Sequence, residues 1–398
     1  MVWEPEIEEL NHRRRLAEKM GGKEGIERQH KRGKLTVRER IAGLADKGSF
    51  REIGALTGGA RYDGDKLVAF TPGNSVIGTC ELDGRRVVLS GGDFTVRGGA
   101  ADAAVGNKPG YAENLALEWR LPYIRLLDAT GGSVKTFEKI GRTYIPGKPG
   151  GKPEYHPLSV IPVVSAVMGS VAGLPAVEAC MAHFNLMVKN TSLLFVAGPM
   201  VVKAALSEDV TKEELGNEQI QAHTSGVIDN VAENEADAFR IIRRFLSYLP
   251  NNVWELPPRT EPTDDPNRRD EGLLSIIPRS VRKIYDPYKI LDHTLDCDSF
   301  FEIQPYFGKS RIIGLARVNG YPVGVMINNP RFLGGSLDMT AGEKVIKFML
   351  MCNTFHLPMV YFADEPGFMV GLEAEKQGIV RAGARMVLAT RETQMPWI

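Results

Sequence analysis

The stretch VIGTCELDGRRVVLSGGDFTVRGGAAD, residues 76–102, recurs farther along the chain as IIGLARVNGYPVGVMINNPRFLGGSLD, residues 312–338. The offset of 236 holds to residue 132, and 13 of the 57 ungapped positions in 76–132 and 312–368 are identical. Average composition would give about four identities. An upstream block agrees, because five residues within 46–53 recur within 296–303 at an offset of 250. A period this long predicts two related structural units in tandem.

Each copy of the repeat starts with a predicted β-hairpin. Asp83-Gly84 and Asn319-Gly320 separate apolar, alternating segments and suit a primed turn, because these residues tolerate positive φ. A Gly-Gly pair then opens a predicted helix, at 100–120 in the first copy and 336–356 in the second. Pro-led apolar strands follow, at 122–127 and 358–362. The order β-β-α-β predicts an α/β fold for both units.

The first copy continues beyond the shared part. Its sequence predicts a strand at 161–168, a glycine turn at 169–173, a helix from about Pro175, and strands at 184–188 and 193–197. Glycine and proline interrupt the apolar run 160–179, so we do not interpret it as a membrane span.

The second copy is expected to be incomplete. Its residues 394–398 repeat the Pro-led entry of the 161–168 strand, and nothing after them corresponds to 165–250.

These patterns divide the chain into four expected regions. They are a helical segment at 1–45, a first unit at 46–250, a Pro-punctuated linker at 251–285 and a partial second unit at 286–398. Within the helical segment, charged amphipathic helices are predicted at 6–19 and 28–45.

Charge and cysteine usage exclude several classes of function. The 49 basic and 49 acidic residues cancel, which favours neither nucleic acid nor an anionic membrane as a partner. The four cysteines lie far apart without a C-x-x-C pair, so neither a zinc site nor a disulfide framework is indicated, and no metal is predicted. With an acidic N-terminal stretch that lacks an apolar targeting core, we expect a cytoplasmic protein.

Several motifs together are specific to one family. They are RQHxRGKLTxRERI at 28–41, DFTVxGG at 93–99, MGxxAG at 168–173, GP at 198–199, EDVTxEELG at 208–216, SYLP at 247–250, GGSLD at 334–338 and PGF at 366–368. Over nearly the whole chain they resemble the carboxyltransferase (beta) subunits of biotin-dependent acyl-CoA carboxylases, the propionyl-CoA and methylcrotonyl-CoA carboxylase family. Relative to that family the chain looks truncated at its C-terminus.

The resemblance implies a fold of tandem crotonase-like (ClpP/crotonase) spiral domains, the second incomplete. It implies that the first domain binds acyl-CoA and that a second domain, from a partner subunit, binds carboxybiotin. The implied partners are a biotin carboxylase and a biotin carboxyl carrier domain or subunit, within a dimer-based homo-oligomer that is usually a hexamer. The implied reaction moves a carboxyl group from carboxybiotin to the α-carbon, or vinylogous γ-carbon, of an acyl-CoA. Released biotin can take the α-proton, so no side-chain base is required.

Such a reaction passes through an enolate, whose oxygen needs preorganised N–H donors. Two glycine turns follow predicted strands of the first unit, and we expect Gly131, Gly132, Gly173 and Leu174 to be the catalytic positions. By the same resemblance we expect the acyl-CoA and biotin contacts to include Gly98, Gly99, Gly334, Gly335, Gly367 and Phe368. An isolated Gly-Gly pair is more often a tight turn without a ligand, so the family match alone favours function at 131–132 and 173.

Two departures from the family pattern leave the acyl group open. The second turn reads Gly173-Leu174-Pro175 where the family usually has two glycines and a small residue, and Pro175 has no N–H. The first turn continues as Ser-Val-Lys-Thr at 133–136 in place of the usual Ala-Arg-Ile-Gln, and a glycine-rich loop follows at 147–152.

Other charged residues receive structural interpretations. The basic run 28–40 is interpreted as a solvated helix face, with the CoA phosphates as the alternative. Asp102 and Asp338 are expected to cap or orient their helices.

Two other functions remain open from the sequence. One is a decarboxylase or hydratase-type relative that uses the acyl-CoA site with another partner. The other is a non-catalytic assembly protein derived from a carboxylase, because the residues expected to hold the biotin oxygen would lie beyond Ile398.

Overall fold

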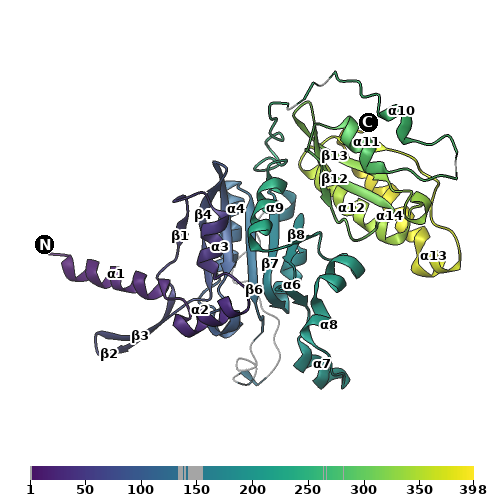
Figure 1. Cartoon of the computed structure of the whole chain (residues 1–398). Coiled ribbons are helices and arrows are strands. Elements are labelled where there is room, and N and C mark those ends of the chain that lie inside the picture. The colour runs from purple at the N-terminus through teal and green to yellow at the C-terminus, as the bar shows by residue number, and fades with distance from the viewer. Residues whose placement is uncertain are drawn as a thin grey trace. The chain divides into compact units, whose positions relative to one another are not determined.

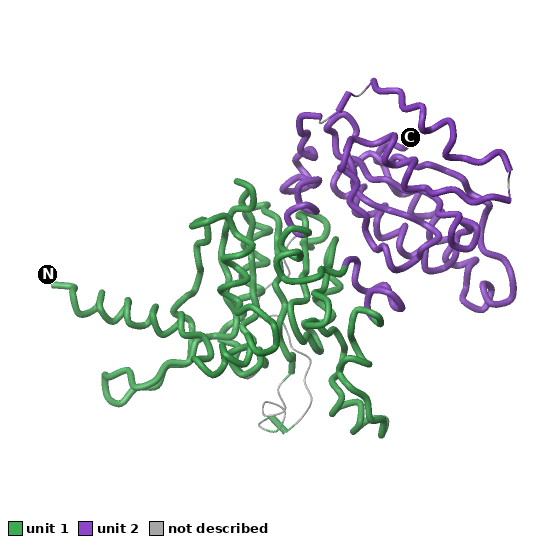
Figure 2. Tube along the Cα trace, viewed as in Figure 1, with its two compact units in different colours: residues 1–220, 231–241 green, residues 221–230, 242–398 purple. Residues whose placement is uncertain are grey.

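The computed structural model describes residues 2–132, 138, 140–141, 156–262, 264–265, 267–280 and 282–398, apart from the side chain of Asp102. The sequence departures at 133–136 and 147–152 lie outside the described residues. The chain forms two compact units, residues 1–220 with 231–241, and residues 221–230 with 242–398 (Figure 2).

Unit 1 is built around a mixed sheet that is parallel in its centre (Figure 1). The strand order is β1-β4-β5-β6-β7-β8-β10, with β9 also paired to β7. The β4–β5 pair is antiparallel, and β5, β6, β7 and β8 run parallel to one another. The strands are β1 (Arg51–Ile53), β4 (Ser75–Leu82), β5 (Arg85–Gly92), β6 (Tyr123–Ala129), β7 (Val163–Ala172), β8 (Phe184–Val188), β9 (Leu193–Phe195) and β10 (Asn230–Ala232), with a separate hairpin of β2 (Gly58–Asp63) and β3 (Lys66–Pro72).

Helices precede and connect these strands. They are α1 (Glu4–Glu18), α2 (Gly22–Lys31), α3 (Val37–Leu44), α4 (Lys108–Trp119), α6 (Leu174–Cys180), α7 (Pro199–Leu206), α8 (Lys212–Gly216) and α9 (Glu235–Leu246). Short 3-10 turns occupy Arg97–Gly99, Ala101–Ala103 and Pro157–Ser159, and a π-helical turn spans Gln219–Thr224.

Unit 2 repeats the start of this plan. Its sheet has the order β11-β12-β13-β14, antiparallel except for the parallel β13–β14 pair. The elements are α10 (Leu273–Ile276), α11 (Pro287–Thr294), β11 (Phe301–Ile303), β12 (Arg311–Val318), β13 (Tyr321–Asn328), α12 (Met339–Thr354), β14 (Met359–Phe362), α13 (Leu372–Gln377) and α14 (Ile379–Glu392), with a 3-10 turn at Leu333–Gly335.

The two units match residue for residue at the start of the sheet, which confirms the predicted repeat. In unit 1, Glu52 of β1 is opposite Gly78 of β4, and in unit 2, Glu302 of β11 is opposite Gly314 of β12. The offsets of 250 and 236 differ by 14 residues, and the chain in that interval of unit 1 carries the β2–β3 hairpin. The predicted hairpin turns are also confirmed, because both residues of each turn have positive φ. The last residues of the chain pair in parallel with β14, since the Met359 amide donates to the Pro396 carbonyl at 2.8 Å.

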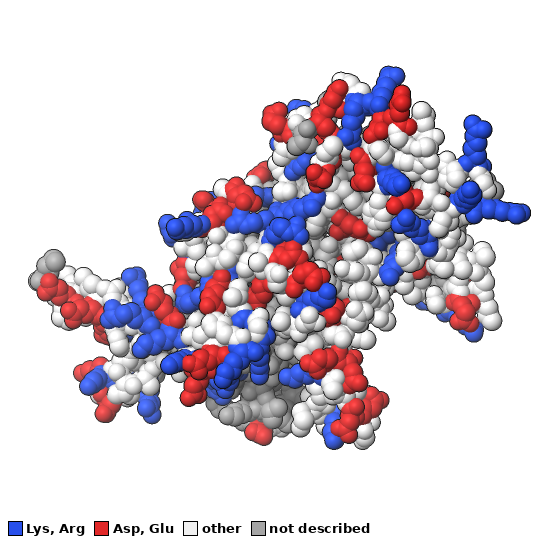
Figure 3. All heavy atoms as spheres, viewed as in Figure 1, with Lys and Arg blue, Asp and Glu red and all other residues white. Residues whose placement is uncertain are grey.

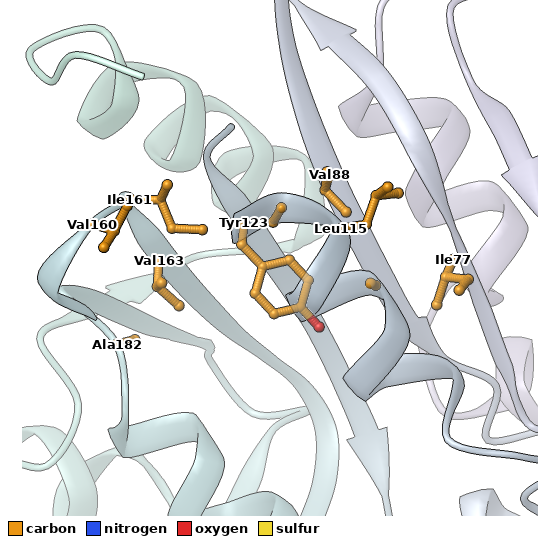
Figure 4. Packing of buried hydrophobic residues seen from close by; sticks show 10 residues of the cluster. Ile77, Val88, Leu115, Tyr123, Val160, Ile161, Val163 and Ala182 are labelled. Carbon is orange, nitrogen blue, oxygen red and sulfur yellow. The ribbon is translucent and has the colours of Figure 1, made fainter. Parts of the chain in front are cut away.

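The core of unit 1 lies between α4 and the sheet (Figure 4). It contains Ile77, Val88, Leu115, Tyr123 and Ile161, each at most 7% exposed. The Tyr123 hydroxyl is buried there and hydrogen-bonds with the Ser90 hydroxyl at 2.8 Å. Burial raises the pKa of Tyr123 to about 12.

Four predicted elements had wrong boundaries. The segment 28–45 is two helices, because the capping box of Thr36 and Glu39 starts α3 afresh after Gly33, whose φ is +70°. The predicted helices at 100–120 and 336–356 start later, at Lys108 and Met339, because each Gly-Gly pair lies in a 3-10 turn, Arg97–Gly99 or Leu333–Gly335, that precedes the helix.

The fourth is the glycine turn predicted at 169–173. Strand β7 continues to Ala172, and its end pairs with β9. Gly169 is part of that strand. Glycine is needed there because an added Cβ would lie 2.2 Å from Asp128 Oδ1 and collide with it.

Candidate functional site

Three glycine turns of unit 1 meet at the edge where β6 and β7 end. The Thr130 amide donates to the Gly98 carbonyl at 3.2 Å, and the Ala101 amide donates to the Gly131 carbonyl at 2.9 Å. An added Cβ on Gly99 would lie 2.8 Å from the Ala129 Cα. The Gly98-Gly99 turn therefore packs directly against the segment that leads from β6 into Gly131-Gly132.

The turn after β6 also contacts the turn after β7. Gly131 has a φ of +75°, and a Cβ there would lie 2.3 Å from the Ala172 carbonyl oxygen. Gly173 has a φ of +69°, and a Cβ on it would lie 4.0 Å from the Gly132 nitrogen. Both positions need glycine for their conformation, and Gly131 needs it for the close approach as well. The structure thus brings the four predicted catalytic positions into one cluster.

The backbone amides of this cluster differ in their hydrogen bonds. The Gly173 amide donates to the Val196 carbonyl at 3.0 Å and lies 3.3 Å from the Phe195 carbonyl. For the Gly132 and Leu174 amides, the described residues provide no hydrogen-bond acceptor. Gly132 is exposed, and Leu174 is half exposed. Gly132 and Leu174 therefore offer N–H groups that a ligand oxygen can use.

The predicted contact residues of unit 2 also gather at one edge of their sheet. The Leu337 amide donates to the Gly367 carbonyl at 2.9 Å, which repeats the Ala101–Gly131 hydrogen bond of unit 1. Gly334 and Gly335 have φ values of +61° and +80°. The Gly335 carbonyl accepts a hydrogen bond from the Arg311 guanidinium at 2.6 Å.

Phe368 stands where unit 1 has Gly132. It is 47% exposed, and its ring packs over Gly383 of α14, where an added Cβ would lie 2.8 Å from the ring.

The interpretation of the basic run 28–40 as a solvated face was wrong for its second half. Lys34 is 5% exposed and Arg40 is 1% exposed. Both bind Asp128, which is fully buried at the end of β6, at 3.0 and 2.9 Å. The Gln29 side-chain amide also donates to Asp128, at 2.9 Å. The sequence patterns did not predict this cluster. Its local signal in the sequence is the capping box at Thr36, which starts the helix α3 that carries Arg40.

Burial and charge act in opposite directions on these cations. Burial lowers the pKa of Lys34, although the adjacent Asp128 opposes the shift. Burial also acts to lower the pKa of Arg40, but hydrogen bonds to Glu235 and the charge of Asp128 raise it above its ordinary value. Arg40 therefore stays charged at every accessible pH.

Asp338 stands at the N-cap position of α12 without a capping hydrogen bond to the backbone. Its carboxylate instead accepts hydrogen bonds from the Ser310 hydroxyl, at 2.8 Å, and from the Thr340 hydroxyl.

The described residues contain no group of three or more His, Cys, Asp or Glu side chains that could hold a metal ion. In the same part of the chain, no helix combines the length and apolar character needed to cross a membrane. Acidic and basic side chains are intermixed over the face seen in Figure 3, as the equal numbers of each predict.

Comparison with known proteins gives concordant results. Residues 28–398 match the model of the carboxyl transferase domain. The chain is 37% identical to the propionyl-CoA carboxylase carboxyltransferase subunit of Haloferax mediterranei, over 100% of this chain and 76% of that protein. It is 34% identical to the methylmalonyl-CoA decarboxylase subunit alpha of Veillonella parvula, over 98% of this chain and 77% of that protein. The solved structure of transcarboxylase 12S, a hexamer assembly with methylmalonyl-coenzyme A bound, matches with a TM-score of 0.87 and 30% identity, over 99% of this chain and 76% of that one.

Proposed function

The chain belongs to the carboxyl transferase domain family, and from that premise we propose that it is the carboxyltransferase subunit of a biotin-dependent acyl-CoA carboxylase acting on propionyl-CoA. The predicted crotonase-like fold is confirmed by the match to transcarboxylase 12S. The acyl group is proposed from the relative in Haloferax mediterranei, whose name specifies propionyl-CoA.

The pair of amides at Gly132 and Leu174 carries the proposal. Carboxylation at the α-carbon of a thioester first removes the α-proton, which places negative charge on the thioester oxygen. Two N–H groups that have no acceptor among the described residues, held by glycine turns that contact each other, suit this oxygen. A donor of this kind typically contributes about 10²–10³ to the rate.

Carboxybiotin, when bound, supplies the carboxyl group and the base that takes the α-proton. The residues of this chain hold the acyl-CoA oxygen, and the rigid turns around Gly131 and Gly173 keep the donors in place before the substrate arrives. The Leu174 side chain, half exposed beside these donors, is proposed to line the acyl end of the site.

We also propose the surroundings of the subunit. Biotin is carried by a separate carrier domain or subunit, charged by a biotin carboxylase, and the subunit forms a dimer-based hexamer. The hexameric transcarboxylase 12S supports this assembly. A cytoplasmic location is supported by Cys80, Cys180, Cys297 and Cys352, none of which is disulfide-bonded to another, as fits a reducing compartment.

A second candidate function is the matching subunit of an acyl-CoA decarboxylase. The 34% identity to the Veillonella parvula protein favours it. Its chemistry uses the same oxyanion donors with the carboxyl group moving from acyl-CoA to biotin. Carboxyl transfer is reversible, so the partner of the subunit distinguishes the two functions. A carboxylase subunit forms a stable complex with a biotin carboxylase, and that complex uses ATP to fix labelled bicarbonate into propionyl-CoA, whereas a decarboxylase subunit forms no such complex.

The test of the site removes one amide without disturbing the turn. Leu174 is the first residue of α6, a position that accepts proline because its N–H has no helical partner. Leu174→Pro removes the proposed donor, and Leu174→Ala keeps the N–H while shortening the side chain. We expect Leu174→Pro to lower kcat for carboxyl transfer from methylmalonyl-CoA to biotin by about 10²–10³. Leu174→Ala should stay within about tenfold of the unchanged protein.

CoA affinity, measured by calorimetry, is the control for folding and should be unchanged in both variants. Equal kcat values for the proline and alanine variants would show that the Leu174 amide is not a donor to the reacting oxygen.

A further inference from the structure

Arg40 of α3 is an almost fully buried cation that the reaction itself does not use. Its guanidinium donates to Asp128 Oδ2 at 2.9 Å and to the Met168 carbonyl at 2.7 Å. Its remaining donors reach both oxygens of Glu235 on α9, at 2.8 and 3.0 Å. One planar group is therefore fixed by three separate segments of unit 1.

Two of these segments are the strands that lead into the amide turns. Asp128 lies in β6, four residues before Gly132, and Met168 lies in β7, six residues before Leu174. The strands touch at the same place, because Gly169 of β7 is packed against the Asp128 carboxylate. The guanidinium thus joins β6 and β7 near the ends from which each strand leads to the proposed oxyanion site, one residue before the end of β6 and four before the end of β7.

Lys34, in the loop between α2 and α3, supports the same connection between β6 and β7 by binding Asp128. Its ammonium group contacts both oxygens of Asp128, at 3.2 and 3.0 Å, and it is as inaccessible as Arg40. The cluster contains two cations, Lys34 and Arg40, and two carboxylates, Asp128 and Glu235, so its formal charge is zero. A neutral cluster does not oppose the negative charge that develops on the substrate oxygen nearby.

We infer that Arg40, supported by Lys34, is a positioning residue for carboxyl transfer: it fixes β6 relative to β7 and thereby sets the spacing of the Gly132 and Leu174 amides. This inference rests on the proposed function, because the spacing matters only if both amides hold one oxygen. Oxyanion donors act through geometry, and a displacement of about 1 Å can cost about 10²-fold in rate.

Arginine is needed here for its shape as well as its charge. The guanidinium reaches Asp128, Met168 and Glu235 at once from a rigid plane, whereas a lysine ammonium in its place is a point charge on a flexible chain. Arg40→Lys keeps the formal charge of the cluster and loses the simultaneous contacts. We expect this variant to lower kcat by about 10- to 100-fold while KM for the acyl-CoA changes less than about threefold.

The matched control is Arg38→Lys on the same helix. Arg38 forms a bidentate ion pair with Glu52, at 2.8 and 3.1 Å, that does not involve β6 or β7. This control should leave kcat unchanged. The full-length protein is used for every variant, with methylmalonyl-CoA and free biotin as the probes.

A double-variant cycle separates positioning from general destabilisation. In a Leu174→Pro background, one donor is already absent and the spacing of the pair no longer matters. Arg40→Lys should therefore lower kcat there by less than about threefold, far less than in the unchanged background. Equal effects in both backgrounds would overturn the inference and leave a purely structural role.

A milder variant covers the case in which Arg40→Lys does not fold. Lys34→Gln removes one support of Asp128, and it should lower kcat by about 3- to 10-fold with KM unchanged. A folded Lys34→Gln protein with full kcat would also overturn the inference. If the unchanged protein transfers no carboxyl group, the proposed function fails, whereas an active protein that is insensitive to Arg40→Lys fails only this inference.

Discussion

The two copies of the repeat share the same backbone arrangement, but the buried charged side chains that stabilise it come from different positions in each copy. In unit 1, Asp128 of the shared strand β6 is buried and receives its cations from the N-terminal segment, at Lys34 and Arg40. In unit 2, its counterpart Asp364 is exposed. A buried charge there is Arg311 of the first hairpin strand, which pairs with Glu365 and stands where unit 1 has Ser75.

This difference distinguishes the features that the fold requires from the features that the proposed site requires. The shared features are backbone ones, namely hairpin turns, strand register and the hydrogen bond that closes the glycine turn. The ionic clusters are not shared, so the fold alone does not demand them. Only in unit 1 does the cluster join the two strands that end in the proposed donors, which assigns that cluster to the site.

The largest expected effect comes from removing the buried carboxylate of unit 1. Asp128→Asn leaves Lys34 and Arg40 buried with half their negative partners, and such a change typically costs about 3–5 kcal/mol. The counterpart Asp364→Asn changes an exposed residue whose partner is the Tyr285 hydroxyl, at 2.8 Å. Its cost should be within about 0.5 kcal/mol. Urea denaturation of the two variants measures the difference.

Equal losses of stability in the two variants would contradict the contrast between the copies. Full carboxyl transfer activity in a folded Asp128→Asn protein would separately weaken the assignment of the cluster to the site.

The repeated frame was predictable because its signals are local. A Gly at the second turn position, an apolar alternation and a Gly-Gly pair are each contained within a few residues, and each reports a backbone conformation. The hairpin turns at 83–84 and 319–320 were therefore predicted correctly. Helix starts were predicted less well, because each glycine pair lies in a 3-10 turn before the helix, and in unit 1 that turn depends on the packing of Gly99 against Asp128 and Ala129, which are distant in sequence.

The ionic cluster was not predictable because its partners are far apart in the chain. Arg40 and Glu235 are separated by 195 residues, and Lys34 and Asp128 by 94. Charged residues are usually exposed, so a basic run near the N-terminus is interpreted as the solvated face of a helix. The turns of the candidate site were located from sequence, but which amides lack an internal partner depends on β9, whose neighbour Val196 takes the Gly173 amide.

A smaller effect should appear in how stability depends on pH. Lys344 of α12 and Lys108 of α4 are counterparts, and each donates to the carbonyl after the first strand of its unit. Lys344 is 2% exposed and holds two more carbonyls. Burial lowers its pKa from 10.5 to about 8, against the opposing charges of Glu302, Asp338 and Asp229.

A lysine with a lowered pKa binds fewer protons in the folded state than in the unfolded state. The contribution of Lys344 to the free energy of unfolding therefore rises as the pH increases from about 8 toward 10.5. Between pH 8 and 9.5, Lys344 should contribute a rise of about 2 kcal/mol, and Lys344→Met should abolish it. Lys108→Met is the control, since burial lowers the pKa of Lys108 to a lesser degree. Unfolding curves that keep the same pH slope in Lys344→Met would contradict the assignment.

The smallest expected effect tests the feature that the copies share. The Asp46 carboxylate accepts hydrogen bonds from both amides of its hairpin turn, at 3.1 and 2.8 Å, and Asp296 does the same at 2.8 and 2.7 Å. Both carboxylates are partly exposed, so each Asp→Ala change should cost about 1–2 kcal/mol. Because the geometry is the same, the two costs should agree within about 0.5 kcal/mol. Thermal or urea unfolding measures both, with Asp83→Asn as a control that converts the first turn to the Asn-Gly sequence of the second. A cost confined to one copy would mean that the repeated frame does not stabilise the two units equally.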